Sequence, residues 1–182
     1  MSHATVLMSG GIDSAACAHF LKSQNHSVRG VFLNYGQAAA ASEFDAARRL
    51  ARFLQTPLSV YEVTGAERFS PGELPFRNAF LITSAAFLSS NKSGLLAIGI
   101  HAGTPYFDCS VAFVESMARV VCEHTNGALR LIAPFLDWTK GEIFEYFVSS
   151  RIPLDLTYSC EAGSTRPCGV CASCRDRRSL GC

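Results

Sequence analysis

The chain has 182 residues, of which 48% are hydrophobic and 17% charged, and its formal net charge is +1. This length and composition fit one globular domain with a sizeable core and exclude a disordered chain. The near-neutral charge argues against direct binding to nucleic acid or a membrane, and no apolar run reaches the ~20 residues that cross a bilayer. Because the chain shows no signal-peptide pattern, we expect a cytoplasmic protein with reduced cysteines.

Apolar runs and helical patterns alternate along the chain. Strands are predicted at residues 5–8, 28–33, 58–62, 95–100 and 129–132. Helices are predicted at residues 14–23, 38–54, 78–90, 111–124 and 139–148, and residues 66–76 are predicted to form a loop. In the second helix, Phe44, Ala47, Leu50 and Phe53 are expected to face inward. The alternation predicts an α/β fold with a parallel sheet.

Residues 9–14, with the sequence SGGIDS, lie between the first predicted strand and the first predicted helix. Unpaired N–H groups at a helix N-terminus suit a phosphate, the glycines allow a close approach, and Ser9 and Ser14 add hydroxyl donors. A carboxylate beside phosphates needs a cation, so we expect Mg²⁺ to bridge Asp13 and ATP phosphates. The GxxxxGK[ST] motif of other phosphate loops is missing. An ordinary glycine-rich turn is the alternative interpretation.

Four of the eight cysteines lie close together near the end of the sequence: Cys160, Cys168, Cys171 and Cys174. Four thiolates at these spacings can close a tetrahedral shell around Zn²⁺, and such a complete set makes the metal structural. An iron–sulfur cluster is the main alternative. We therefore expect a small C-terminal zinc knuckle at residues 156–182, attached to an ATP-binding α/β domain at residues 1–155. Cys17 and Cys122 lie in helical patterns and are predicted to be buried.

Residues 9–14 resemble the SGGxDS pyrophosphatase loop (PP-loop) of the adenine-nucleotide α-hydrolase-like (HUP) superfamily. Its members activate an oxygen of the substrate as an adenylate and release pyrophosphate. Further stretches resemble the 7-cyano-7-deazaguanine synthase (QueC) family: residues 34–37, 75–78, 99–101, 106–109, 138–142 and the cysteine segment. The resemblance implies a single Rossmann-like (HUP) domain with a five-stranded parallel sheet and a small C-terminal zinc knuckle.

The same resemblance implies the reaction. ATP, ammonia and 7-carboxy-7-deazaguanine would give 7-cyano-7-deazaguanine through an acyl adenylate, with release of AMP and pyrophosphate. The product is a precursor in queuosine biosynthesis. Members of the family are commonly homodimers that act on a small molecule, without direct contact to nucleic acid or a membrane.

Candidate site residues follow from the motifs and the resemblance. ATP is expected to bind at Ser9, Gly10, Gly11, Ile12, Asp13 and Ser14. Catalytic roles are predicted for Asp13, Arg77 and Lys140, the last two as cationic partners of the phosphates or the substrate carboxylate. Substrate is expected to bind at Tyr35, Gln37, Arg77 and Asp108, the last because a carboxylate accepts two hydrogen bonds from a guanine-like edge.

Structural roles remain open for several of these residues. Arg77 could form a surface salt bridge, Lys140 could lie in a solvated helical turn, and residues 35–37 could form a plain loop. Residue His101 is expected to fill a loop rather than to bind a metal, because no second ligand lies at a suitable spacing.

The chain departs from the family pattern around the expected substrate pocket. The loop at residues 101–105 is short and lacks an acidic residue, and Phe76 replaces a glycine. A relative that passes the adenylate to an amine on a protein or another partner, as in antiphage defence, is therefore an alternative. Two others are less favoured: sulfur transfer to tRNA, because no basic aromatic surface is visible, and a non-catalytic zinc module, which leaves residues 9–14 without a purpose.

Overall fold

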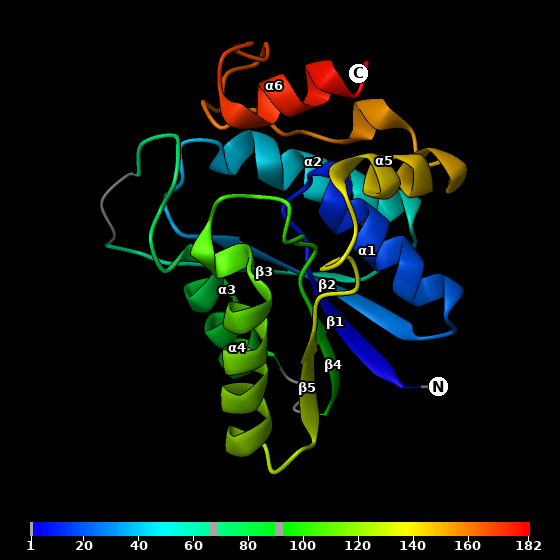
Figure 1. Ribbon diagram of the computed structural model, residues 1–182, viewed down its shortest axis with the longest axis vertical. Helices are drawn as coiled ribbons and strands as arrows, with labels where there is room; N and C mark the ends of the chain where they lie inside the picture. The colour runs from blue at the N-terminus through cyan, green and yellow to red at the C-terminus, as the bar shows by residue number, and fades with distance from the viewer. Residues whose placement is uncertain (1, 66–68, 90–92) are drawn as a thin grey trace.

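The computed structural model describes residues 2–65, 69–89 and 93–182. Its centre is a parallel sheet of five strands in the order β3-β2-β1-β4-β5 (Figure 1). The strands are β1 (His3–Leu7), β2 (Ser27–Asn34), β3 (Leu58–Glu62), β4 (Gly94–Ala97) and β5 (Leu129–Ile132). The predicted α/β fold with five parallel strands is thereby confirmed.

Helices cover both faces of the sheet. They are α1 (Ile12–Ser23), α2 (Ala40–Phe53), α3 (Arg77–Leu88), α4 (Val111–His124), α5 (Lys140–Ser149) and α6 (Ala172–Ser179), with short 3₁₀ helices η1 (Phe107–Cys109) and η2 (Leu154–Leu156). One core joins α1, α2 and α5 to the sheet, and a second core joins α3 and α4 to the opposite face (Figure 1). Successive residues of β1 serve both cores, since Val6 faces the first and Leu7 the second.

The strand order creates a ligand site. The chain runs outward from β1 through β2 to β3 and then returns to place β4 on the other side of β1. The loops that leave the carboxyl ends of β1 and β4 therefore diverge to opposite faces of the sheet. In open α/β sheets, ligands bind in the crevice outside such a switch point.

The fourth strand is shorter than the predicted range 95–100. It ends at Ala97, although the N–H of Ile98 still donates to the carbonyl of Ile132 over 3.1 Å. Beyond it, Gly99 passes so close to α1 that a Cβ there would lie 2.7 Å from the carbonyl oxygen of Asp13. The backbone leaves the sheet here and follows the first turn of α1.

The inward stripe of α2 differs from the predicted one. Ala47 and Leu50 are buried as expected, whereas Phe44 is 36% and Phe53 46% exposed. The helix buries Ala46, Ala47, Leu50 and Ala51. At 100° per residue the two phenylalanines fall at the two edges of this stripe, which explains their partial exposure.

Burial also differs from expectation at one of the cysteines. Cys17 is buried as predicted, but Cys122 is exposed on α4. The helix predicted at residues 78–90 buries only one stripe although it is largely apolar, and Phe87 is 82% exposed. Ser90, its expected last residue, lies outside the described part of the chain. Part of the aromatic surface of α3 therefore lies outside the core and is exposed.

The last helix, α6, was not predicted from the sequence. Its residues ASCRDRRS have no apolar periodicity, so only the tertiary structure reveals it. The carboxylate of Glu161 accepts hydrogen bonds from the N–H and the hydroxyl of Ser173, at 3.0 and 2.9 Å. The first of these bonds satisfies one N–H group at the start of α6 in the manner of a helix cap. None of the described helices is long and apolar enough to cross a bilayer.

Candidate functional site

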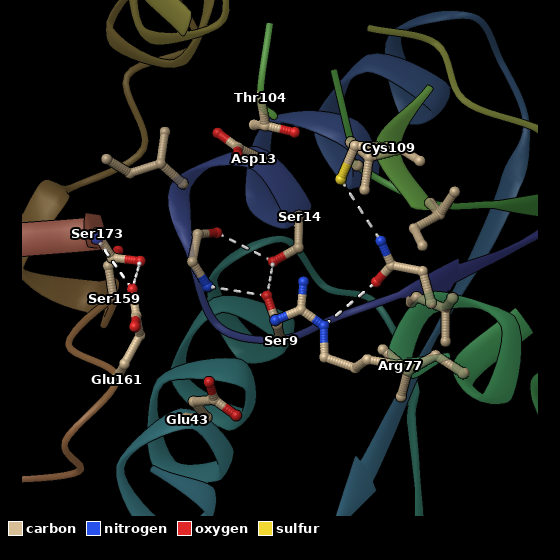
Figure 2. A pocket seen from close by; sticks show the side chains of 18 of the residues that line it. Ser9, Asp13, Ser14, Glu43, Arg77, Thr104, Cys109, Ser159, Glu161 and Ser173 are labelled. Atoms are coloured by element: carbon tan, nitrogen blue, oxygen red, sulfur yellow. Dashed lines mark hydrogen bonds between the residues drawn. The ribbon is translucent and has the colours of Figure 1, made fainter. Parts of the chain in front are cut away.

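A cavity of about 330 Å³ opens at the carboxyl ends of the strands, which is a size suited to a small molecule. Its walls come from the loops after β1, β2 and β4, from the start of α3, and from α6 (Figure 2). The predicted site residues among its lining are Ser9, Gly11, Ile12, Asp13, Ser14, Tyr35, Gln37, Arg77, Asp108 and Lys140. Lining residues as far apart by number as Leu7 and Leu180, 173 positions, thus meet in one cavity.

The loop after β1 is held in shape by its own polar groups (Figure 2). Ser14 Oγ donates to the carbonyl of Gly11 over 3.0 Å and accepts from Ser9 Oγ over 3.3 Å. The first turn of α1 has no side-chain cap among the described residues, so its N–H groups remain available to an anion. This geometry would suit a phosphate.

Gly10 is the one predicted loop residue that does not line the cavity. Its φ of +86° is a left-handed conformation, and a Cβ there would lie 2.6 Å from the carbonyl oxygen of Glu43 and 2.9 Å from the Cβ of Ala46. Both features require glycine. Gly10 therefore fixes how closely the loop packs on α2.

Asp13 and Lys140 form an ion pair at the mouth of the loop. Lys140 Nζ lies 2.6 Å from both carboxylate oxygens, and the side chains are 29% and 23% exposed for Lys140 and Asp13. Thr139 and Glu142 form the predicted capping box, which fixes Lys140 in the first turn of α5. The Lys140 ammonium is thus paired with the Asp13 carboxylate, which is the group predicted to bind Mg²⁺.

Arg77 and Asp108 lie on the opposite wall. Arg77 opens α3 and points toward the loop that carries Ser9 (Figure 2). The N–H of Asn78 donates to Asp108 Oδ2 over 3.2 Å, and Asn78 Nδ2 donates to the Asp108 carbonyl over 3.0 Å. Asp108 thereby fastens η1 to the start of α3, which is a structural role that the sequence did not indicate.

The residue before Arg77 has an unusual backbone. Phe76, which stands where the family pattern has glycine, has a φ of +66° and is 82% exposed. A bulky residue in the left-handed region is strained, and nothing in its burial offsets that strain. Phe76 thus keeps the left-handed backbone conformation that a glycine at this position would favour.

Gln37 braces the floor of the cavity. Its Nε2 donates to the carbonyl of Leu33 over 3.2 Å and to Glu43 Oε2 over 3.0 Å, and its Oε1 accepts from the N–H of Tyr35 over 2.9 Å. The amide is therefore satisfied by the protein itself. It orients Glu43, a cavity carboxylate that the sequence did not single out.

Aromatic side chains line two sides of the cavity. The Tyr35 ring lies 5.9 Å from each of the rings of Phe69 and Phe80, and burial raises the pKa of Tyr35 to about 12. On the other side, His101 is only 8% exposed and its Nδ1 has no hydrogen-bond partner among the described residues. Burial lowers the pKa of His101, which keeps the imidazole neutral at pH 7. Both groups therefore face the cavity without charge.

The segment at residues 158–177 forms a wall of the cavity rather than a separate appendage. The N–H of Tyr158 donates to the carbonyl of Gly10 over 2.9 Å, which ties the segment to the phosphate loop. The Arg177 Nε donates to Ser159 Oγ over 3.1 Å within it. The segment adds these lining residues, none of which the sequence indicated as cavity residues: Tyr158, Ser159, Glu161, Ala172, Ser173, Asp176 and Arg177; Leu180, just beyond it, also lines the cavity. No local spacing could have revealed them.

The four predicted cysteine ligands come together. Their Sγ atoms all lie within 4.8 Å of one another, and Cys168 and Cys174 are 4.0 Å apart. A tetrahedral shell with Zn–S bonds of ~2.3 Å has edges of about 3.8 Å, so the set fits a bound metal. Burial alone would raise the pKa of the Cys160 thiol, but hydrogen bonds from the backbone of Cys168 and Ala162 outweigh it and lower that pKa to about 6. Cys160 therefore favours the thiolate form that binds metals, whereas burial raises the pKa of Cys174 to about 12, so a metal would have to displace the Cys174 proton.

The sequence matches the family model described as "Queuosine biosynthesis protein QueC" over residues 3–74 and 60–180. The chain belongs to the QueC family. The 7-cyano-7-deazaguanine synthase of Methanoculleus marisnigri is 31% identical to it, over 98% of this chain and 93% of that protein. The synthase of Methanosphaerula palustris is 28% identical over 96% of this chain and 92% of that protein. The resemblance in the motifs thus extends along nearly the whole chain.

Solved structures confirm the fold. A predicted subunit of a tRNA methyltransferase from Methanocaldococcus jannaschii superposes with a TM-score of 0.59 at 18% identity, covering 82% of this chain and 76% of that one. The U34-tRNA thiolase NcsA from Methanococcus maripaludis, solved with its [4Fe-4S] cluster, has a TM-score of 0.56 at 14% identity, covering 98% of this chain and 64% of that one. At these identities the likeness shows the shared fold alone, so this QueC-family chain has the fold of PP-loop proteins.

Proposed function

We propose that this chain is an ATP-dependent carbon–nitrogen ligase that converts 7-carboxy-7-deazaguanine and ammonia to 7-cyano-7-deazaguanine, with release of AMP and pyrophosphate. One observation carries the proposal: in a chain of the QueC family, a single cavity unites the phosphate loop with Arg77, Asp108 and Lys140. Relatives that carry the name of this synthase cover more than nine-tenths of the chain. They favour the nitrile-forming reaction over conjugation to a protein amine, tRNA thiolation or a non-catalytic module.

The proposed roles follow from charge and position. The N–H groups of residues 9–14 would hold the ATP phosphates, and Arg77 and Lys140 would neutralise charge on the phosphates or the substrate carboxylate. Mg²⁺ between Asp13 and the phosphates would release the Lys140 ammonium toward the reacting α-phosphate. Such an enzyme acts by positioning and by electrostatic stabilisation, without a protein nucleophile.

The heterocycle would lie toward the wall formed by α3 and η1. Asp108 is the acceptor that we assign to the guanine-like edge, because its carboxylate lines the cavity while one oxygen is used by Asn78. Tyr35 offers an aromatic surface beside it, and Gln37 acts indirectly through Tyr35 and Glu43. We therefore expect substitution of Asp108 to weaken binding of substrate more than binding of ATP.

For the cysteine cluster we propose Zn²⁺ in a structural role. A set of four thiolates leaves no open position for substrate, and the cluster supports the segment that contacts Gly10. Residues 156–182 would thus form a knuckle on the ATP-binding unit at residues 1–155 while completing its cavity. Metal analysis and an absorption spectrum separate the two candidates, since a colourless protein excludes an iron–sulfur cluster.

The decisive experiment uses pure protein with ATP, Mg²⁺, ammonium and 7-carboxy-7-deazaguanine. Mass spectrometry should detect AMP, pyrophosphate and the nitrile, and Arg77→Met should lower all three relative to the wild-type protein. Formation of AMP with an amide as the final product would reject the nitrile-forming function. Absence of AMP with this substrate would reject the proposal altogether. Sedimentation of the same sample tests the homodimer that we propose from the family resemblance.

A further inference from the structure

We propose that Glu43 is the catalytic base that binds ammonium beside the adenylate and removes one of its protons. The inference rests on the proposed function and extends it to the second substrate. Ammonia reacts through its lone pair, whereas at pH 7 the dissolved species is almost entirely ammonium. A site that uses it therefore needs an acceptor for the proton.

Glu43 lies where the nucleophile would have to approach. It belongs to the first turn of α2, and its backbone carbonyl packs against Gly10 of the phosphate loop. Its carboxylate lines the cavity on the side of the loop and below Ser9 (Figure 2). Arg77, the proposed partner of the phosphates or the substrate carboxylate, lies close enough to influence its charge. An acyl carbon held between the loop and Arg77 would be within the reach of this carboxylate.

A hydrogen bond from the protein orients the Glu43 carboxylate but leaves one of its two oxygens without a partner among the described residues. Gln37 Nε2 donates to Oε2 over 3.0 Å, and the other bonds of the Gln37 amide fix that donor. No hydrogen bond to Oε1 and no ion pair of Glu43 within 4.0 Å is found in the described part of the chain. One oxygen is thus held for orientation, and the other is available to an ammonium N–H.

The remaining carboxylates of the cavity are less suitable. Asp13 is paired with Lys140, Asp108 accepts from Asn78, and Glu161 accepts from Ser173. Glu73 and Asp176 are exposed to water, which would keep ammonium hydrated. Glu43 alone among the cavity carboxylates of the described residues is half-buried, is held by a side-chain amide rather than a backbone N–H, and has no cationic partner within ion-pair distance.

The electrostatics around Glu43 favour its taking up a proton. Burial raises the pKa of Glu43, while the Gln37 hydrogen bond and the Arg77 charge oppose that rise without cancelling it. The ionisable and charged groups that act on it are Tyr35 and Arg77. Because burial raises the pKa of Tyr35 to about 12, that neighbour stays neutral while Glu43 takes up and releases its proton.

The step balances as follows. Ammonium gives one proton to the Glu43 carboxylate, and the nitrogen lone pair that this exposes forms the C–N bond at the acyl carbon. The C–O bond to AMP then breaks, its electron pair leaves with the phosphate oxygen, and the added nitrogen loses a second proton to water. Glu43 returns its proton to water before the next turnover.

The test compares Glu43→Gln with the wild-type protein. The matched control is Glu73→Gln, which replaces an exposed carboxylate at the edge of the same cavity by an amide. The amide introduced by Glu43→Gln can still accept the Gln37 hydrogen bond but cannot take a proton. We expect kcat/KM for ammonium at pH 7 to fall about 100-fold in Glu43→Gln and to stay within twofold in Glu73→Gln. The deficit should shrink as the pH rises, because free ammonia then increases tenfold per pH unit. With hydroxylamine, which is neutral at pH 7, Glu43→Gln should approach the wild-type rate.

Pyrophosphate exchange into ATP without any amine reports adenylation alone and keeps the two proposals apart. A wild-type protein without exchange would overturn the proposed function. Exchange in both proteins, with an ammonium deficit that is absent or the same at every pH, would overturn the role of Glu43. Loss of exchange in Glu43→Gln would also overturn it, because the residue would then serve the loop rather than the nucleophile.

Discussion

The loop at residues 9–14 and the segment at residues 158–177 face the same cavity but are built by different physical means. The loop is fixed by its position between β1 and α1, by a left-handed glycine and by short polar bonds among Ser9, Gly11 and Ser14. The segment has no strand, and its shape depends on four thiols, the 3.0 Å bond from Ser173 to Glu161 and the Tyr158 contact with Gly10. The loop is shaped by the strand and helix that flank it, and the segment by contacts between residues that are not adjacent in the sequence.

Two regions that line the same cavity can therefore be stabilised in different ways. The loop holds its conformation whenever the sheet is formed, because adjacent residues determine it. The segment has to hold its loops together without a strand, and a metal is an efficient way to achieve that in a stretch too short for a core of its own. We expect the two regions to respond differently to substitution and to chelation.

The largest effect is expected for Gly10→Ala in the loop. A left-handed alanine and a contact at 2.6 Å with a backbone oxygen should together destabilise the protein by about 2–5 kcal/mol and lower AMP formation at least ~100-fold. Gly127→Ala is the matched control, since its φ is +77° but nothing lies within 4 Å of a Cβ. Thermal unfolding measures the stability of each variant, and the AMP assay measures its activity. Equal losses in the two variants would show that the contact with α2 is unimportant.

The next effect concerns the ion pair between the loop and α5. Lys140→Met should lower kcat/KM for ATP about 100-fold, because it removes a cation near the reacting phosphate. Lys22→Met is the control, since Lys22 donates to the Leu54 carbonyl rather than to a cavity group. Steady-state kinetics with varied ATP give the result. A lower melting temperature with unchanged kinetics would instead assign Lys140 to a structural role.

Metal removal tests directly whether the segment at residues 158–177, unlike the loop at residues 9–14, depends on a bound metal. Chelation, or Cys168→Ser, should weaken ATP binding about 10-fold or more, because the segment that holds Tyr158 against Gly10 loses its support. The secondary structure of the sheet should persist. Cys122→Ser, an exposed cysteine on α4, should change neither the metal content nor ATP affinity. Titration calorimetry with ATP decides, and unchanged affinity in the metal-free protein would make the segment a true appendage.

The smallest effect is expected at the cap of α6. Glu161→Ala leaves the N–H of Ser173 without its acceptor and should destabilise the protein by about 1 kcal/mol, with a few-fold rise in KM for ATP. Glu161→Gln keeps an acceptor oxygen and should behave like the wild-type protein. Denaturant titration measures the difference. If both variants lose the same stability, the negative charge rather than the hydrogen bond supports the helix.

The order and type of the elements could be predicted because local patterns carry that information. All five predicted strands exist, and the capping box at Thr139 and Glu142 marks the start of α5 as expected. The errors share one cause. The end of β4 at Ala97 and the exposure of Phe53 and Cys122 depend on which neighbours pack there, and a single sequence window does not contain that information.

The sequence by itself determined which residues come together at both ends of the chain. Residues 9–14 are adjacent in a strand–loop–helix unit, and the thiols from Cys160 to Cys174 lie within one short stretch, so backbone geometry alone brings each set together. Only the tertiary structure decided that Lys140 pairs with Asp13, that Glu43 enters the cavity and that Tyr158 reaches Gly10. Those contacts join residues 33 to 148 positions apart by number. Strand order and helix packing set such distances, and no local motif encodes them.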